Sequence, residues 1–181
     1  MAVLVAYASA MGSTQEIAQH IADRMASSLD GIECRSVDDV ESVSDYEGVV
    51  VGSAVHNQSW LPAAEHFFAE QAPELAKRPV WAFTVGMADA LPKPFRKKGA
   101  ALQQARLAGA LPQDVALRGH RMFSGVYKAD QMSSALRILF RLTGGRFGDF
   151  RDWTAIDAWT DEIAAQLATP ASPASPGNAT A

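Results

Sequence analysis

A loop of small hydroxyl side chains follows the first apolar run, residues 2–7. The loop contains Ser9, Ala10, Met11, Gly12, Ser13 and Thr14. Hydroxyls can donate hydrogen bonds to an anion, and glycine lets the backbone approach it closely. Helical periodicity begins directly afterwards, so N–H groups at the helix N-terminus would point at the same anion. The loop therefore predicts an anion site. The alternative is a serine-rich turn in which Ser13 or Thr14 only caps the helix.

This loop favours one phosphate group over a triphosphate. It contains no lysine, and the chain lacks the Gly-x4-Gly-Lys pattern of nucleotide triphosphatases. A phosphate monoester is therefore the anion that we expect.

Two further segments are expected to lie beside this loop, because ligands of parallel α/β sheets bind outside the carboxyl ends of the strands. One follows the apolar run 48–52, and the other follows 79–85. Trp60 and His56 can stack on a flat ring or hydrogen-bond to it, and Met87 can line a ring face. The alternatives are core packing for Trp60 and Met87 and a satisfied core position for His56. The candidate site residues in these segments are Ser53, Ala54, Val55, His56, Asn57, Trp60, Val85, Gly86 and Met87.

The elements that position these loops alternate between strand-like and helix-like segments. Buried strands are expected at residues 2–7, 32–37, 48–52 and 79–85 and within 115–123. Helices are expected at about 14–28, 61–76, 95–107, 133–142 and 153–167. Strands separated by helix-length segments indicate βαβ units, whose right-handed crossovers place helices on both faces of a parallel sheet. The pattern therefore predicts an α/β fold.

Several segments resemble the flavodoxin-domain family. The loop matches the family's phosphate-loop pattern, Ser/Thr-x-Thr-Gly-x-Thr, at Ser9, Gly12 and Thr14 and departs from it at Met11. The other similar segments, within a match over about residues 2–168, are 50–55, 123–125, 139–145 and 149–153. Leu-Thr-Gly-Gly in the third of these is typical of the branch that contains the menaquinone-dependent protoporphyrinogen IX dehydrogenases. The phosphate loop departs from that branch, which tends to carry an Arg-Asp pair before the glycine.

The resemblance implies FMN as cofactor and a flavodoxin-like three-layer sandwich with a five-stranded parallel sheet in the order 2-1-3-4-5. The FMN-binding domain would span residues 1–168, with an insert at about 127–150. Residues 169–181 contain only Thr, Pro, Ala, Ser, Gly and Asn, so we expect a disordered tail.

The implied function is that of an FMN-dependent oxidoreductase, a quinone-linked dehydrogenase of protoporphyrinogen or a similar apolar anionic substrate. An electron carrier without its own substrate is the main alternative. A module that has lost its cofactor is another, and Met11 is its motivation. No side chain is assigned as acid or base.

The insert contains an amphipathic segment. Two arginines, Arg137 and Arg141, flank an apolar helical face made of Leu136, Leu139, Phe140 and Thr143. Such a face suits a membrane surface or an acidic, apolar substrate. The alternative is a helix packed on the sheet with its arginines in solvent.

Charge is divided unevenly along the chain. Residues 1–92 carry 4 Lys/Arg and 13 Asp/Glu, a net charge of −9. Residues 93–151 carry 12 Lys/Arg and 3 Asp/Glu, a net charge of +9. The basic segment suggests an anionic partner: an acidic membrane surface, an anionic small molecule or an acidic redox protein. A solvated basic face is the alternative. We expect a redox partner or a quinone, and no nucleic acid.

No apolar run approaches the roughly 20 residues that cross a bilayer, and the N-terminus lacks a signal-peptide pattern. We therefore expect a cytoplasmic protein, with peripheral contact at the inner face of the membrane as an open alternative. Cys34 is the only cysteine, which excludes an internal disulfide and a cysteine-built metal site. The four histidines show no metal-ligand spacing, so no metal is expected.

Overall fold

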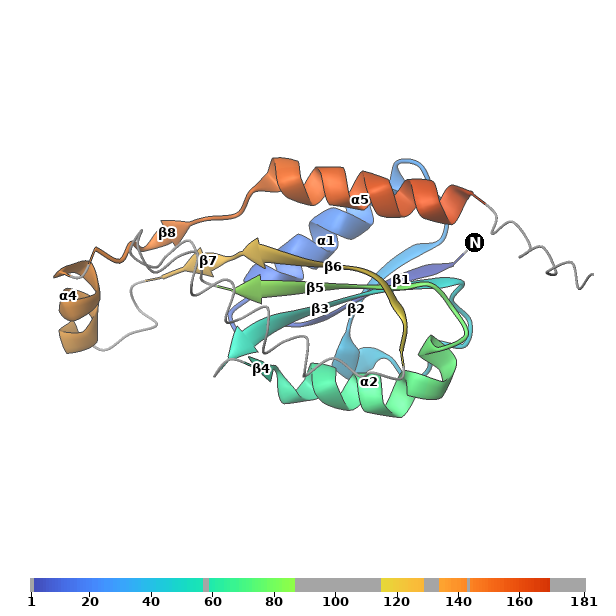
Figure 1. The fold of residues 1–181 in the computed structure, drawn as a ribbon, viewed down its shortest axis with the longest axis horizontal. Helices are drawn as coiled ribbons and strands as arrows, with labels where there is room; N and C mark the ends of the chain where they lie inside the picture. The colour runs from blue at the N-terminus through green and yellow to red at the C-terminus, as the bar shows by residue number, and fades with distance from the viewer. Residues whose placement is uncertain (1, 57–58, 87–114, 129–133, 143, 170–181) are drawn as a thin grey trace, which may run out of the picture.

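The computed structural model describes residues 2–56, 59–86, 115–128, 134–142 and 144–169 (Figure 1). The strands are β1 (Val3–Ala8), β2 (Ile32–Ser36), β3 (Gly48–His56), β4 (Ser59–Trp60), β5 (Val80–Gly86), β6 (Leu117–Ser124), β7 (Val126–Tyr127) and β8 (Gly148–Asp149). The α-helices are α1 (Ser13–Ala26), α2 (Pro62–Leu75), α4 (Ser134–Leu142) and α5 (Trp153–Ala168), and a short 3-10 helix spans Val37–Asp39. The helix expected at residues 95–107 and the tail from residue 170 onward lie outside the described residues.

Five strands form a parallel sheet in the order β2-β1-β3-β5-β6. This order confirms the predicted 2-1-3-4-5 arrangement, because β5 and β6 are the fourth and fifth long strands along the chain. The short β4 was not expected and pairs antiparallel with the end of β3. Figure 1 shows the arrowheads of β3, β5 and β6 at one edge of the sheet, where ligands of such sheets bind.

Helices cover both faces of the sheet, as the arrangement of α1 and α5 opposite α2 shows (Figure 1). Side chains alternate along β1, so that Leu4 and Ala6 belong to the core under α2 while Val3 and Val5 face α1 and α5. The β1 strand is apolar on both faces because both faces are buried. The three-layer α/β sandwich is therefore confirmed.

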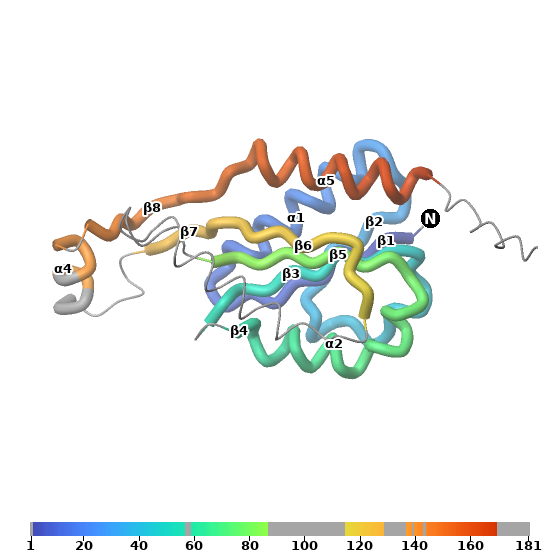
Figure 2. The backbone as a smooth tube through the Cα atoms, viewed as in Figure 1, coloured from blue at the N-terminus to red at the C-terminus, as the bar shows by residue number. Residues whose placement is uncertain are grey.

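The chain leaves the sheet between β6 and α5. Strand β7 pairs antiparallel with β8, and α4 lies between them in sequence. Figures 1 and 2 show α4 beyond the carboxyl edge of the sheet, so it does not pack on the sheet. It packs instead through Phe140, whose ring centroid lies 5.5 Å from that of Tyr127 and 5.2 Å from that of Phe147. Ile138 and Leu142 remain 62% and 79% exposed.

Within the described part of the chain, no helix combines the length and the apolar character that crossing a membrane requires.

Candidate functional site

The loop between β1 and α1 presents a helix N-terminus. Gly12 occupies the N-cap position with φ +87°, a left-handed conformation that favours glycine. Its N–H donates to Ser9 Oγ at 3.0 Å, which closes the loop. The expected cap by Ser13 or Thr14 is wrong, because the helix begins at Ser13 and no side chain of the described residues caps it. The backbone N–H groups of the first turn of α1 are therefore available to an acceptor other than the described side chains, such as a bound ligand.

Thr14 carries the most informative polar atom of the loop. Its side chain is 1% exposed, and its Oγ1 has no hydrogen-bond partner among the described residues. Buried polar groups in folded proteins are nearly always hydrogen-bonded. An orphaned hydroxyl at a helix N-terminus therefore points to a ligand that accepts hydrogen bonds.

A cavity of about 310 Å³ opens beside this loop. The ends of β3 and β5 and the corner between β6 and β7 form its other walls. The lining residues are Ala10, Met11, Ser13, Thr14, Ala54, Val55, His56, Val85, Gly86, Gly125, Val126 and Tyr127. The first nine of these are residues that the sequence marks as site candidates, so the structure brings three distant segments together at one cavity.

The other candidates lie elsewhere. Ser9 and Gly12 shape the loop through their shared hydrogen bond and do not line the cavity. Ser53 is fully buried, and its Oγ accepts from the N–H of Leu61 at 3.1 Å and donates to the carbonyl of Ala54 at 2.9 Å. It therefore fixes the β3–β4 connection. Asn57 and Met87 lie outside the described residues.

Trp60 lies in the core under α2 and does not line the cavity, so the core-packing alternative holds for it and the expected contact with a ring at the site does not. It is 3% exposed and packs with its ring centroid 5.4 Å from that of Phe68. Its indole N–H donates to Thr84 Oγ1 at 2.9 Å, and the same hydroxyl lies 2.8 Å from Nε2 of His120. The physical reason is β4, which pairs Trp60 with Val55 and leaves its ring within this core. Burial also lowers the pKa of His120.

Three residues of the β6–β7 corner line the cavity although they were not among the candidates. A Cβ on Gly125 would lie 2.9 Å from Ser13 Oγ and 2.8 Å from Val85 Cγ1, so only glycine lets this corner touch the loop. Val126 and Tyr127 follow it, and burial raises the pKa of the Tyr127 hydroxyl. The segment Phe-Ser-Gly at residues 123–125 contributes to the family resemblance, but its sequence does not indicate that it contacts the loop between β1 and α1.

A charged cluster ties the insert to the start of α1. The Arg151 side chain is 11% exposed, donates from Nε to Asp149 Oδ1 at 2.9 Å, and pairs with Glu16 in the first turn of α1. Its guanidinium carbon also lies 4.6 Å from the ring centroid of Trp153. The hydrogen bonds from Arg151 hold the pKa of Asp149 below its ordinary value. The strand that returns from the insert is thereby fixed beside the helix whose N-terminus faces the cavity.

The sequence matches the flavodoxin domain family over residues 4–142. The chain belongs to the flavodoxin domain family. No curated protein matches it.

Solved flavodoxins share the fold of this flavodoxin-domain protein. A flavodoxin from the domain Archaea is 14% identical with a TM-score of 0.56, and the match covers 93% of this chain and all of that one. A short-chain flavodoxin associated with a bacterial microcompartment is 12% identical with a TM-score of 0.52, over 95% of this chain and 100% of that one. The rubredoxin oxygen:oxidoreductase of Desulfovibrio gigas matches at 15% identity and a TM-score of 0.56, over 92% of this chain and 36% of that protein. At these identities the similarity concerns the fold alone.

The cavity of this flavodoxin-domain protein lies at the point where the order of the strands reverses. From β1 the chain passes to β2 on one side, and β3 then lies on the other side of β1. The chain leaves β1 toward α1 on one face of the sheet and leaves β3 toward α2 on the other, and in open α/β sheets this separation makes room for a ligand. The orphaned hydroxyl of Thr14 lies at this place.

Proposed function

We propose that this chain binds FMN, with the FMN phosphate in the loop between β1 and α1. The observation that carries the proposal is the buried Oγ1 of Thr14, which has no partner among the described residues. A phosphate monoester supplies an anionic acceptor for this hydroxyl and for the N–H groups of the first turn. The absence of a lysine from the loop agrees with a single phosphate.

The residues around the loop fit such a group. A Cβ built on Gly12 would meet no atom within 4 Å, so the space in front of the N-cap is open to a ligand. Met11 departs from the family pattern, but its side chain is 66% exposed and does not pack into the loop. The loop therefore keeps its shape without a hydroxyl at this position.

The remainder of the cavity would hold the flavin ring. Backbone at Ala54, Val55 and Gly86 would lie along its edge, with His56 at the end of β3 and Tyr127 on the insert side. FMN supplies reversible transfer of electrons or hydride when it is bound. The part of the chain is to hold the ring, orient it and limit its contact with water.

One observation favours an enzyme over a carrier. The insert places an aromatic cluster of Tyr127, Phe140 and Phe147 next to the cavity and leaves Ile138 and Leu142 exposed on α4. Such a surface suits an apolar partner, and the net +9 of residues 93–151 suits an anionic one. We therefore favour a cytoplasmic FMN-dependent oxidoreductase that acts on an apolar anionic substrate, such as protoporphyrinogen. A quinone, reached by peripheral contact of α4 with the inner face of the membrane, would accept the electrons.

Titration with FMN tests the cofactor. We expect flavin absorption that co-elutes with the protein and quenching of flavin fluorescence upon binding. A colourless protein that leaves flavin fluorescence unchanged would remove the proposal.

Turnover separates the enzyme from the carrier. With FMN bound, we expect oxidation of protoporphyrinogen in the presence of a quinone, and complementation of a strain that lacks this oxidation. Ile138→Ser with Leu142→Ser should reduce quinone-dependent turnover and leave FMN binding intact, because neither side chain lines the cavity. Failure of turnover, together with reduction by a flavodoxin reductase and delivery of electrons to an acceptor protein, would establish the carrier instead.

A further inference from the structure

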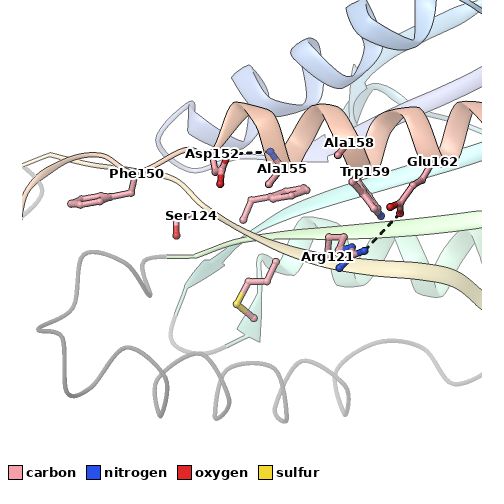
Figure 3. Close-up of a pocket in the computed structure, with 10 residues that line it drawn as sticks. Arg121, Ser124, Phe150, Asp152, Ala155, Ala158, Trp159 and Glu162 are labelled. Carbon is pink, nitrogen blue, oxygen red and sulfur yellow. Dashed lines mark hydrogen bonds and ion pairs between the residues drawn. The ribbon is translucent and has the colours of Figure 1, made fainter.

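A groove runs between the edge strand β6 and helix α5, apart from the FMN cavity. It consists of two adjoining hollows of about 440 and 260 Å³, which share Arg121, Trp159 and Glu162. Figure 3 shows the larger hollow, in which Arg121 of β6 faces Glu162 of α5. Neither hollow shares a lining residue with the cavity beside the β1–α1 loop. Ligand binding here is therefore separable from FMN binding.

An irregularity in β6 brings two arginines to the smaller hollow. Val80 pairs with Leu117 and Trp81 pairs with Gly119, so Arg118 is an extra residue in the strand. A bulge of this kind re-aims a side chain, whereas regular alternation would put residues three apart on opposite faces. The guanidinium carbon of Arg118 lies 5.8 Å from the ring centroid of Trp81, which belongs to the core facing α1 and α5. Both Arg118 and Arg121 line this hollow.

Two indole groups converge on the same hollow. A Cβ built on Gly119 would lie 3.2 Å from Trp81 Cδ1, 3.9 Å from Trp81 Nε1 and 4.0 Å from Trp159 Nε1, so the absence of a side chain at Gly119 leaves both indole N–H groups free of steric cover on this side. Trp81 is 1% exposed, and its N–H has no acceptor among the described residues. A buried donor without a partner is costly, which points to an acceptor that occupies this space.

The charges of the groove favour an anion at its Gly119 end. The titratable residues that line it are Arg118, His120, Arg121 and Glu162, and burial lowers the pKa of His120, which favours its neutral form. Arg121 and Glu162 form a loose pair at 3.7 Å, with both side chains more than half exposed. Asp152 lines only the larger hollow and caps α5 by accepting from the N–H of Ala155 at 3.0 Å. Near Gly119 the donors are thus indole and guanidinium groups, and positive charge is in excess.

We propose that the Gly119 end of this groove binds an oxyanion, a phosphate or a carboxylate group. The indole N–H groups of Trp81 and Trp159 would donate to it, and Arg118 and Arg121 would neutralise it. The inference goes beyond FMN binding and does not depend on it.

Indole N–H resonances in a two-dimensional ¹⁵N–¹H spectrum test the proposal directly. Inorganic phosphate and acetate are titrated separately into the protein at constant ionic strength, which shows the preferred type of anion. We expect a saturable shift of the Trp81 and Trp159 resonances, assigned with the variants Trp81→Phe and Trp159→Phe. The Trp60 resonance should stay in place because its N–H already donates to Thr84. No tryptophan lines the FMN cavity, so phosphate bound there would not mimic the result.

Matched variants make the test specific. Arg118→Gln should weaken binding by about tenfold, whereas Arg146→Gln removes the same charge from an exposed position outside the groove and should change it little. Gly119→Ala should weaken the shifts, because its Cβ would stand between the two indole N–H groups, 3.9 and 4.0 Å from their nitrogens. Resonances that never move, or that move equally in both arginine variants, would overturn the proposal. Contact of the Trp81 N–H with water alone, seen as a cross-peak that the anions do not remove, would overturn it as well.

Discussion

Replacing Thr14 by valine is predicted to raise the stability of the FMN-free protein and to weaken FMN binding. Valine keeps the branched shape of threonine and removes only the hydroxyl, which is buried and unpartnered among the described residues. An unsatisfied buried polar group costs about 1–3 kcal/mol. Because Thr14 lines a cavity, a small rearrangement can bring water to the hydroxyl, and we expect a gain near the lower end, about 1 kcal/mol.

The same change removes a hydrogen bond to a charged phosphate. Such bonds contribute about 1.5–3 kcal/mol, which corresponds to a dissociation constant for FMN that is about 10–150 times higher. FMN at about 100 times the wild-type dissociation constant stabilises the wild-type protein by about 2.7 kcal/mol. The valine variant, with affinity reduced ten- to a hundredfold, would gain about 0.4–1.4 kcal/mol under the same conditions. The variant is therefore the more stable protein without FMN and the less stable one with it.

Urea unfolding with and without FMN, together with titration of flavin fluorescence, measures both quantities. Thr160→Val is the matched control, because Thr160 is also fully buried but its Oγ1 donates to the carbonyl of Ile156 at 2.8 Å. It should leave FMN affinity unchanged. A Thr14→Val protein that is less stable than the wild type without FMN, or that binds FMN within a factor of about two of the wild type, would refute the reasoning.

Three further outcomes follow from the structure. Burial lowers the pKa of His120 below its ordinary value of about 6.5, so the unfolded chain takes up the proton at a higher pH than the folded protein does. The free energy of unfolding should therefore fall as the pH drops from about 6.5 through the lowered pKa of the folded protein. His120→Gln should flatten this part of the pH profile in urea unfolding. Burial raises the pKa of the Cys34 thiol to about 11, so a disulfide reagent at neutral pH should react slowly with the folded protein and fast after unfolding in denaturant. Gly12→Ala should cost about 1–2 kcal/mol in urea unfolding through its φ of +87°, although its Cβ would meet open space; an unchanged midpoint would show that the loop relaxes.

The sheet could be predicted because its strands are buried on both faces and read as short apolar runs. The apolar run 48–52 lies within β3, and the run 79–85 coincides with β5 except at its first residue; β3 and β5 are both inner strands of the sheet. The end of β3 was placed too early. Ser53 pairs with Ala8 of β1 and Ala54 pairs with Val85 of β5, and β4 then pairs with the last two residues of the strand, which therefore ends at His56. Such pairing joins residues far apart in sequence and leaves no local pattern.

The shape of the loop between β1 and α1 could be predicted for the opposite reason, because its geometry is local. A turn, a glycine with positive φ and a helix start fit within six residues. Trp60 and Tyr127 show the limit of such reasoning. The sequence suggests a place at the ring site for Trp60, which lies under α2, and gives no such indication for Tyr127, which lines the cavity. In both cases the direction of an aromatic ring depends on a short antiparallel pairing, β3 with β4 and β7 with β8, that propensity alone does not reveal.

The position of the insert follows from contacts at its two ends. At its start, Gly125 packs against Ser13 so closely that no side chain would fit between them. At its end, Arg151 pairs with Glu16. Both partners belong to the first turn of α1, the same turn that holds the orphaned hydroxyl of Thr14. Both ends of the insert therefore contact the N-terminal turn of α1, the turn that would bind the phosphate. For this reason Tyr127 can be held against the cavity although α4 itself projects away from the sheet.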